Sequence, residues 1–202
     1  MAARMAHDAG TAARILDVAE RLVQVRGFNG FSYADIAAEL GITKAALHYH
    51  YPGKADLGEA LIARYAARFT DALAGVDAAA GTPSTRLTGY ADLYLQVLRN
   101  QKMCLCGMLA AEYQTLPPPM QEAVVTFFDE NETWLAKVLE QGRNDGSLHF
   151  SGSARDMARL IIGSLEGAML VARTYGDPGR FWASAESLLA GLARPSAAPA
   201  VA

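Results

Sequence analysis

Several features that would point to a membrane, secreted or disulfide-stabilised protein are scarce in this sequence. It contains two cysteines, Cys104 and Cys106, and no uncharged apolar run long enough to cross a bilayer. Thiols this close together do not form a disulfide framework, and the N-terminus lacks the continuous apolar stretch of a secretory signal. We therefore expect a protein of the reducing cytoplasm, with no membrane partner.

Signals for β-strands and for catalytic centres are nearly absent as well. Apolar residues recur at intervals of three and four along almost the whole chain, a period that is typical of α-helices. The sequence has no Gly-rich phosphate loop, no constellation of metal ligands and no nucleophile with an identifiable base. These absences predict an all-α protein that is not an enzyme and that needs neither a cofactor nor a metal ion.

The residues that are present fit an ordinary globular protein. Apolar side chains make up 51% of the 202 residues and charged ones 19%, and the net charge is -3. Residues 1–68 hold eight Lys and Arg against seven Asp and Glu, whereas the remainder holds ten against fourteen. Any contact with nucleic acid must therefore come from a local arrangement of side chains rather than from bulk charge.

The N-terminal part predicts three helices, the last two of them short and joined by a tight turn. They are expected over residues 11–26, 32–40 and 43–51. Each is followed by residues that end a helix, namely Gly27, Gly41 and the pair Pro52-Gly53. Ser32 and Asp35 form a variant capping box at the start of the second helix. A short helix, a turn and another short helix is the geometry of a helix-turn-helix.

The rest of the chain predicts longer helices. They are expected over residues 54–73, 84–102, 104–116, 120–143, 153–175 and 177–193, and Pro117-Pro118-Pro119 should stop the third of them. Residues 1–9 are expected to be frayed. The predicted organisation is a DNA-binding domain over 10–53, a helical ligand-binding and dimerisation domain over 54–193, and a flexible tail over 194–202.

The third predicted helix carries the surface that suggests a function. Its outward positions hold hydrogen-bond donors, aromatic rings and a cation, and no carboxylate lies between Thr43 and Lys54. Such a face can enter the major groove of DNA without repelling phosphates. Two histidines on it, His48 and His50, are two positions apart and therefore about 200° around a helix, so they do not converge on one metal ion.

The run ARILDVAERLVQVRGFNGFSYADIAAELGITKAALHYHYPGKADLGEAL closely resembles the N-terminal domain of tetracycline-repressor (TetR) family regulators. By that resemblance, the residues that contact base edges are Lys44, Ala45 and His48. The residues that contact phosphates are Ser32, Tyr33, Thr43, Tyr49, His50 and Lys54. Two positions depart from the family pattern, because His48 stands where Tyr is more common and Tyr51 where Phe is more common. The first departure affects base preference and could make DNA binding sensitive to pH.

The resemblance also implies an effector-binding and dimerisation domain. Candidates for the effector pocket are Tyr90, Tyr94, Cys104, Met108, Glu112, Tyr113, Phe127 and Glu166, although most aromatic residues in this region are expected to be core. Glu112 and Glu166 lie on mostly apolar helices, so each should need a basic side chain or a ligand as its partner. Candidates for the dimer interface are Gly163, Gly167, Trp182 and Leu188, because a helix that is apolar nearly all round must be covered on both sides.

The leading interpretation is a homodimeric DNA-binding regulator, most simply a repressor on a pseudo-palindromic operator, released by a small-molecule or electrophilic effector. An adaptor that binds only proteins would explain the helices but not the acid-free face with its histidines. Two interpretations of Cys104 and Cys106 stay open. They are either small buried hydrophobes or, as in some members of the family, thiols that sense electrophiles.

Overall fold

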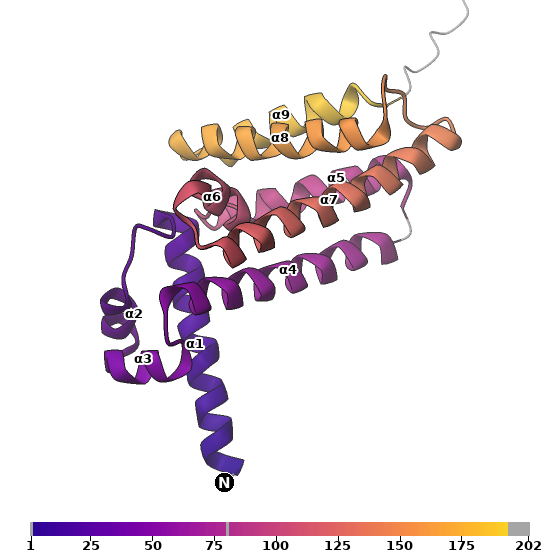
Figure 1. Ribbon diagram of the computed structural model, residues 1–202. Helices are drawn as coiled ribbons and strands as arrows, with labels where there is room; N and C mark the ends of the chain where they lie inside the picture. Colours follow the sequence, from indigo (N-terminus) through magenta and orange to yellow (C-terminus); the bar gives the residue numbers. More distant parts are fainter. Residues whose placement is uncertain (1, 80, 194–202) are drawn as a thin grey trace, which may run out of the picture. The chain divides into compact units, whose positions relative to one another are not determined.

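The protein is described from a computed structural model, which covers residues 2–79 and 81–193. In this part of the chain every regular element is helical, and the β-type pairing consists of an isolated bridge between Leu148 and Ala193 (Figure 1). The elements are α1 (Ala2–Arg26), α2 (Tyr33–Leu40), α3 (Lys44–His50), α4 (Lys54–Ala78), α5 (Pro83–Arg99), α6 (Leu105–Ala111), the 3-10 turn η1 (Tyr113–Thr115), α7 (Pro118–Asn144), α8 (Ala154–Thr174) and α9 (Pro178–Ala190). The all-α prediction is confirmed. No described helix has both the length and the apolar character needed to span a membrane.

Contacts between residues group the chain into two compact units. The first comprises Met1–Thr70 and Gln101–Phe128, and the second comprises Asp71–Asn100 and Asp129–Ala202. Because α4 and α7 each run through both units, one cut along the sequence does not separate them. The predicted boundary between residues 53 and 54 therefore stays a prediction, and the predicted tail over 194–202 lies outside the described residues.

In the first unit, α1 forms a core with α2, α3 and α6. The apolar face of α1 is buried: Ile15 and Ala19 are fully inaccessible, and Leu22 is nearly so. Ile36 of α2 and Leu47 of α3 are also fully buried, so the inner faces of both short helices are fixed by apolar contacts. α1 begins at Ala2, nine residues before the start that the sequence predicted, and the expected fraying of residues 1–9 stays a prediction.

The second unit packs α5 against α8 and α9. Its core includes side chains that are buried at regular helical intervals on these helices, among them Tyr90, Leu165, Met169, Phe181 and Ala185. Periodicity of this kind is the signal from which the helices were predicted.

Around the prolines that follow α6, the helix ends differ from the prediction. The helix expected over 104–116 is split into α6 and η1, and α7 begins at Pro118 rather than Met120. Proline ends a helix when it stands in the interior, but its missing N–H is harmless in the first turn, where no intrahelical acceptor exists. Pro118 and Pro119 therefore form the start of α7, whereas the sequence predicted that the helix would begin after them, at Met120.

Candidate nucleic-acid interface

The helix-turn-helix is built from local hydrogen bonds that the sequence predicted. The carboxylate of Asp35 accepts hydrogen bonds from the backbone N–H and the hydroxyl of Ser32, both at 2.7 Å, which closes the start of α2. These hydrogen bonds hold the pKa of the Asp35 carboxyl below its usual value. Gly41 takes a left-handed conformation with φ of 65° after α2. The hydroxyl of Thr43 accepts the N–H of Ala46 and caps α3.

Tyr33, at the start of α2, is hydrogen-bonded to the turn that follows α3. It is buried, and its hydroxyl donates to the carbonyl oxygens of Tyr51, at 2.9 Å, and of Gly53, at 2.7 Å. Burial raises the pKa of the Tyr33 phenol to about 12, with smaller contributions from the charges of Asp56 and Tyr51. The hydroxyl is thus engaged within the domain, whereas the sequence analysis expected it to contact a phosphate. In this structure it holds the start of α2 against the turn that follows α3.

Lys54 has a similar internal role. Its ammonium donates to the carbonyl oxygens of Phe28 and Phe31 and lies over both rings, 4.6 Å and 4.3 Å from their centroids. Burial lowers the pKa of Lys54, and the negative charges of Glu112 and Asp35 oppose that shift. In this structure the ammonium fixes the turn between α1 and α2, and its expected phosphate contact stays a prediction.

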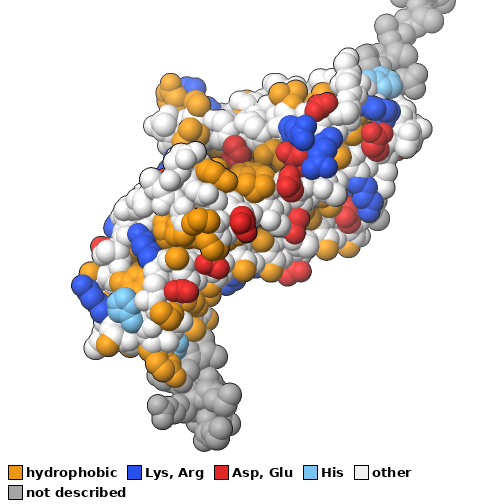
Figure 2. All heavy atoms as spheres, viewed as in Figure 1, with side chains coloured by type: hydrophobic (Ala, Val, Ile, Leu, Met, Phe, Trp, Pro, Cys, Tyr) orange, Lys and Arg blue, Asp and Glu red, His pale blue; other side chains and the backbone are white. Residues whose placement is uncertain are grey.

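The outward face of α3 is polar and exposed. Lys44, Ala45, His48 and Tyr49 are all exposed, Tyr49 to 72%, whereas Leu47 faces the core. Thr43 is exposed and His50 is half-buried. Figure 2 shows histidine and basic side chains over the region where Figure 1 places α2 and α3. Among the described residues of α3, none is acidic, so the face that resembles a recognition helix offers donors and aromatic rings to a polyanion.

His48 occupies a defined position on this face. Its Nδ1 lies 3.0 Å from the carbonyl oxygen of Pro52, and its ring lies 4.8 Å from the ring of Tyr33. The ring forms part of the wall of a surface depression of about 390 Å³. That depression is lined by Phe31, Ser32, Tyr33, Ala34, Lys44, His48 and Lys54. The structure therefore brings five of the predicted DNA-contact residues together in one place.

Glu112 joins the segment after α6 to the turn between α1 and α2. Its carboxylate accepts the N–H of Phe28 at 2.6 Å and that of Asn29 at 3.3 Å. Gly27 takes φ of 85°, which favours glycine, and a Cβ there would lie 2.7 Å from a carboxylate oxygen of Glu112, so the Glu112 side chain would have to shift. The sequence analysis expected a basic side chain or a ligand as the partner of Glu112, and backbone amides are the partner instead.

A second link in the first unit was not predicted. The N–H of Met103 donates to the carbonyl oxygen of Gln24 at 3.1 Å, and Nε2 of Gln24 donates to the carbonyl oxygen of Met103 at 3.0 Å. The side chain of Asn29 also donates to the hydroxyl of Thr115 at 2.7 Å. A buried Gln on an otherwise apolar helix face was the available signal, since such a group needs a partner.

The effector-pocket candidates fall in both units. In the first unit Cys104 and Phe127 are buried, the hydroxyl of Tyr65 lies 3.7 Å from the Sγ of Cys104, and Met108 and Tyr113 are half-buried. In the second unit the hydroxyl of Tyr90 donates to the side-chain oxygen of Asn131 at 3.1 Å and lies 3.2 Å from that of Tyr94. Glu166 is half-buried. Their role in ligand binding stays a prediction.

One face of α8 in the second unit is open. Gly163 and Gly167 are exposed, and a Cβ added at either would meet no atom within 4 Å. Leu160, Leu170 and Val171 are 52%, 56% and 55% exposed, and they share this face at helical spacing. The sequence analysis named the glycines but missed these three apolar residues, which continue the same stripe. Trp182 and Leu188 of α9 are half-buried.

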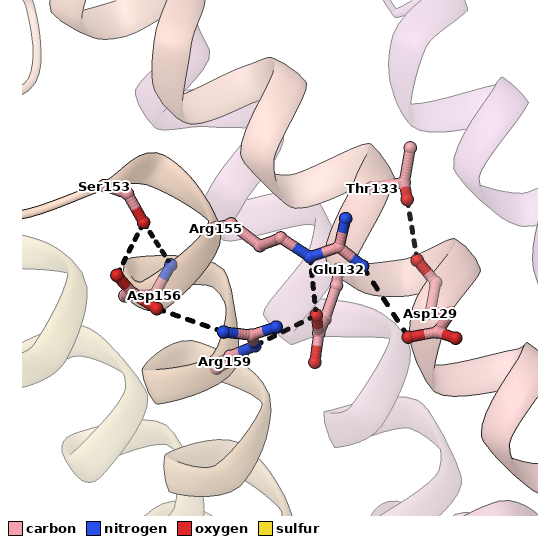
Figure 3. Close-up of polar contacts among 7 residues, drawn as sticks. All are labelled: Asp129, Glu132, Thr133, Ser153, Arg155, Asp156 and Arg159. Carbon is pink, nitrogen blue, oxygen red and sulfur yellow. Dashed lines mark hydrogen bonds and ion pairs between the residues drawn. The ribbon is translucent and has the colours of Figure 1, made fainter.

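An ion-pair cluster fixes the start of α8 to α7 (Figure 3). Glu132, whose side chain is only 16% exposed, accepts from Nε of Arg155 and from Nε of Arg159, both at 3.2 Å. Arg159 also pairs with Asp156, which in turn accepts from the hydroxyl of Ser153 at the cap of α8. The first turns of α8 are thereby held in the second unit while its apolar face stays uncovered.

The chain is similar to known proteins in both sequence and structure. The model of bacterial regulatory proteins of the tetR family matches residues 15–61, and that of a tetracyclin repressor-like C-terminal domain matches residues 83–187. A crystal structure of a TetR-family transcriptional regulator from Agrobacterium tumefaciens is 32% identical with a TM-score of 0.89, covering 93% of this chain and 100% of that one. The transcriptional repressor NemR of Escherichia coli is 27% identical over 203 residues, or 96% of this chain and 97% of NemR. The transcriptional regulator LmrA of Bacillus subtilis is 26% identical over 169 residues, or 80% and 85% of the two chains.

Proposed function

This chain belongs to the TetR family of bacterial regulatory proteins, and on that premise we propose that it is a homodimeric repressor that leaves its operator when an effector binds. DNA-binding transcriptional regulation follows from the family. The observation that carries the proposal is the exposed, acid-free face of α3, presented by a helix-turn-helix that is closed by caps at Ser32 and Thr43. The proposal extends the family assignment to particular residues, to the assembly and to the mode of release.

The proposed division of labour on the DNA follows the exposure of each side chain. Lys44, Ala45 and His48 contact base edges in the major groove, whereas Thr43, Tyr49, His50 and Ser32 contact phosphates. Tyr33 and Lys54 support the helix-turn-helix from inside the domain, because their polar atoms are bound to backbone carbonyl oxygens. They position the reading helix and do not need to touch DNA.

The proposed dimer uses the open face of α8 together with α9. Three large apolar side chains that are more than half exposed are costly to leave in water, and the two glycines permit close approach of a second helix. A two-fold dimer presents two reading helices to successive major grooves, about 34–36 Å apart, which is why the operator is expected to be pseudo-palindromic.

The proposed release of DNA passes through the segment that begins at Gln101. Within the first unit this segment is bound to α1 through the Gln24–Met103 pair, and to the turn before α2 through the carboxylate of Glu112. A ligand that displaces this segment would remove the acceptor of the Phe28 N–H and shift the position of α2 and α3. Differential affinity of the ligand for the two arrangements would supply the free energy.

An electrophilic effector is the second candidate. Cys104 and Cys106 are 1% and 0% exposed, and burial in apolar surroundings makes thiols unreactive, which favours a reversible ligand. The electrophilic alternative is supported by the Sγ of Cys104, which accepts the N–H of Gly107 at 3.4 Å. A backbone N–H at the start of a helix favours the thiolate, which is the reactive form. Labelling with a mild electrophile tests it. We expect both thiols to react only after denaturant is added, and operator release by the electrophile in wild type but not in Cys104→Ser would establish the alternative.

Selection of bound sequences from a pool of random duplex DNA tests the proposed function as a whole. We expect an enriched pseudo-palindrome with half-sites about one helical turn apart or slightly more. A gel shift with the DNA upstream of the protein's own gene gives an independent readout. A pool that shows no enrichment after repeated rounds would refute sequence-specific binding.

A further inference from the structure

Only one nitrogen of the His48 ring is available to a partner outside the domain. Nδ1 lies 3.0 Å from the carbonyl oxygen of Pro52, and a carbonyl oxygen can only accept a hydrogen bond. Nδ1 therefore carries a proton in both charge states of the ring, and the neutral ring is the Nδ1–H tautomer. Nε2 therefore accepts a hydrogen bond from a partner when the ring is neutral and donates one when the ring is protonated.

A second contact fixes the direction in which this nitrogen points. The ring of His48 packs on the ring of Tyr33 at 4.8 Å between centroids, and Tyr33 is itself held by two hydrogen bonds to carbonyl oxygens. By the geometry of imidazole, Nε2 then points away from Pro52. His48 is exposed, one helical turn after Lys44 on the same face of α3. The ring is thus preorganised by groups that belong to α2 and to the turn after α3.

Resting on the proposed function, we propose that Nε2 of His48 reads the exocyclic group of one base in each half-site and distinguishes amino bases from keto bases. In the major groove adenine and cytosine present an amino donor where guanine and thymine present a carbonyl acceptor. The neutral ring, with Nε2 as acceptor, selects an amino base. The protonated ring, with Nε2 as donor, selects a keto base. The preference at this one position therefore inverts with pH.

The groups that surround His48 do not reproduce this behaviour. The pKa of Tyr33 is about 12, so its charge does not change near neutral pH. Lys44 and Lys54, which line the same depression, are donors without acceptor capacity when charged. Among the described residues that line it, none is acidic; the nearby carboxylate of Asp56 is occupied by the N–H of Gly53 at 2.8 Å. His50, whose ring packs on Tyr49 at 5.2 Å, is the other imidazole of α3 and serves as the control.

The test is selection from random duplex DNA with the full-length protein at about pH 8 and about pH 5.5, on either side of the range in which imidazoles titrate. We expect the same pseudo-palindrome at both pH values, except for one position per half-site. That position should change from adenine or cytosine to guanine or thymine. Binding titrations on duplexes that differ only there should show a preference of about threefold to tenfold in each direction, the range of a single hydrogen bond.

Two variants of exposed or half-exposed histidines make the assignment specific. His48→Gln keeps a hydrogen-bonding side chain that does not titrate, so its preference at that position should be the same at both pH values. His50→Gln should weaken binding to all sequences alike, because His50 is a proposed phosphate contact, and it should keep the inversion at that position. Nitrogen chemical shifts of His48 in the free protein give a readout that does not depend on DNA, and they should report the Nδ1–H tautomer at pH 8.

Each outcome decides one point. A wild-type motif that is identical at both pH values, or an inversion that persists in His48→Gln, overturns the role of His48 while leaving the proposed function intact. An Nε2–H tautomer at pH 8 overturns it as well. Absence of any enriched motif at either pH refutes the proposed function, and is distinguishable because it affects all positions.

Discussion

Two exposed helix faces of this protein differ in how they are held and in what they offer. The face of α3 is polar, and its side chains are oriented by neighbours, as Thr43 is by its cap and His48 is by Pro52 and Tyr33. The face of α8 is apolar, and a Cβ added at either of its two glycines would meet no atom of the described residues within 4 Å. A face that reads a hydrogen-bonding pattern needs its groups fixed in advance, whereas a face that associates by burial needs area and close approach.

The largest effect is expected from placing a large side chain on the open face of α8. Gly167→Leu should leave the fold of one chain intact, because the added atoms meet open space, but it should separate two facing helices and yield monomers or aggregates. DNA affinity should fall by about a hundredfold or more, since two weak half-site contacts no longer act together.

Sedimentation measures the assembly of Gly167→Leu, and Gly75→Leu is the matched control because a Cβ at Gly75 also meets open space. The control should stay a dimer with unchanged DNA affinity. If Gly167→Leu sediments as the wild-type dimer does, then the dimer interface lies on a different surface, and the face of α8 is not the one through which two copies associate.

The next effect concerns the reading face itself. Lys44→Ala should cost about 1–3 kcal/mol of operator binding if the ammonium reads guanine, and it should relax specificity at one position per half-site. Lys137→Ala, at a lysine on α7 that is also exposed, is the control and should bind as wild type. Equal losses of affinity on operator and on random DNA would show instead that Lys44 contacts phosphates.

The local signals of the reading face were readable from the sequence, whereas its long-range supports were not. Ser32, Asp35 and Gly41 act within a few residues of one another, so their spacing alone predicted the start and the end of α2. Lys54 bonds to carbonyl oxygens 26 and 23 residues away, and Glu112 accepts an N–H 84 residues away. Such partners depend on how the turns bring the chain together, which no spacing rule contains.

The same reason explains what was missed on α8. The G-x-x-x-G pair was visible as a pattern, but a nearly all-apolar helix does not show which of its faces stays uncovered. Only the packing of α8 on α5 and α9 separates buried Leu165 from exposed Leu170. The family resemblance implies phosphate contacts for Tyr33 and Lys54 but does not show the internal hydrogen bonds that both side chains make to backbone carbonyl oxygens.

Lys54 offers a smaller test of the difference between reading and positioning. If its ammonium acts only on the carbonyl oxygens of Phe28 and Phe31, then Lys54→Ala should lower the free energy of unfolding by about 1–3 kcal/mol, because two carbonyl groups lose a charged donor. The slope of log affinity against log salt should stay that of wild type. A slope reduced by about one would mean that Lys54 neutralises a phosphate, as the family resemblance implied.

The smallest expected effect uses two matching helix caps, one behind each face. The hydroxyl of Ser32 holds the pKa of Asp35 below 3.8 at the start of α2, and the hydroxyl of Ser153 does the same for Asp156 at the start of α8. A carboxyl whose pKa is lower in the folded state stabilises the fold when ionised. This contribution is complete above pH 3.8, where the unfolded chain also ionises, and it is lost as the pH falls from there through the folded pKa.

Asp35→Asn and Asp156→Asn should each therefore lower stability at pH 7 and make it less sensitive to acid below pH 3.8, as measured by urea unfolding at several pH values. The two variants should differ in DNA binding. Asp35 closes the helix that supports α3, so its loss should also weaken operator affinity slightly, whereas Asp156→Asn should leave half-site recognition unchanged because its cap supports α8. If both variants lose operator affinity equally, then both caps act through the stability of the whole protein. In that case the cap of α2 has no separate role in supporting the DNA-reading face of α3.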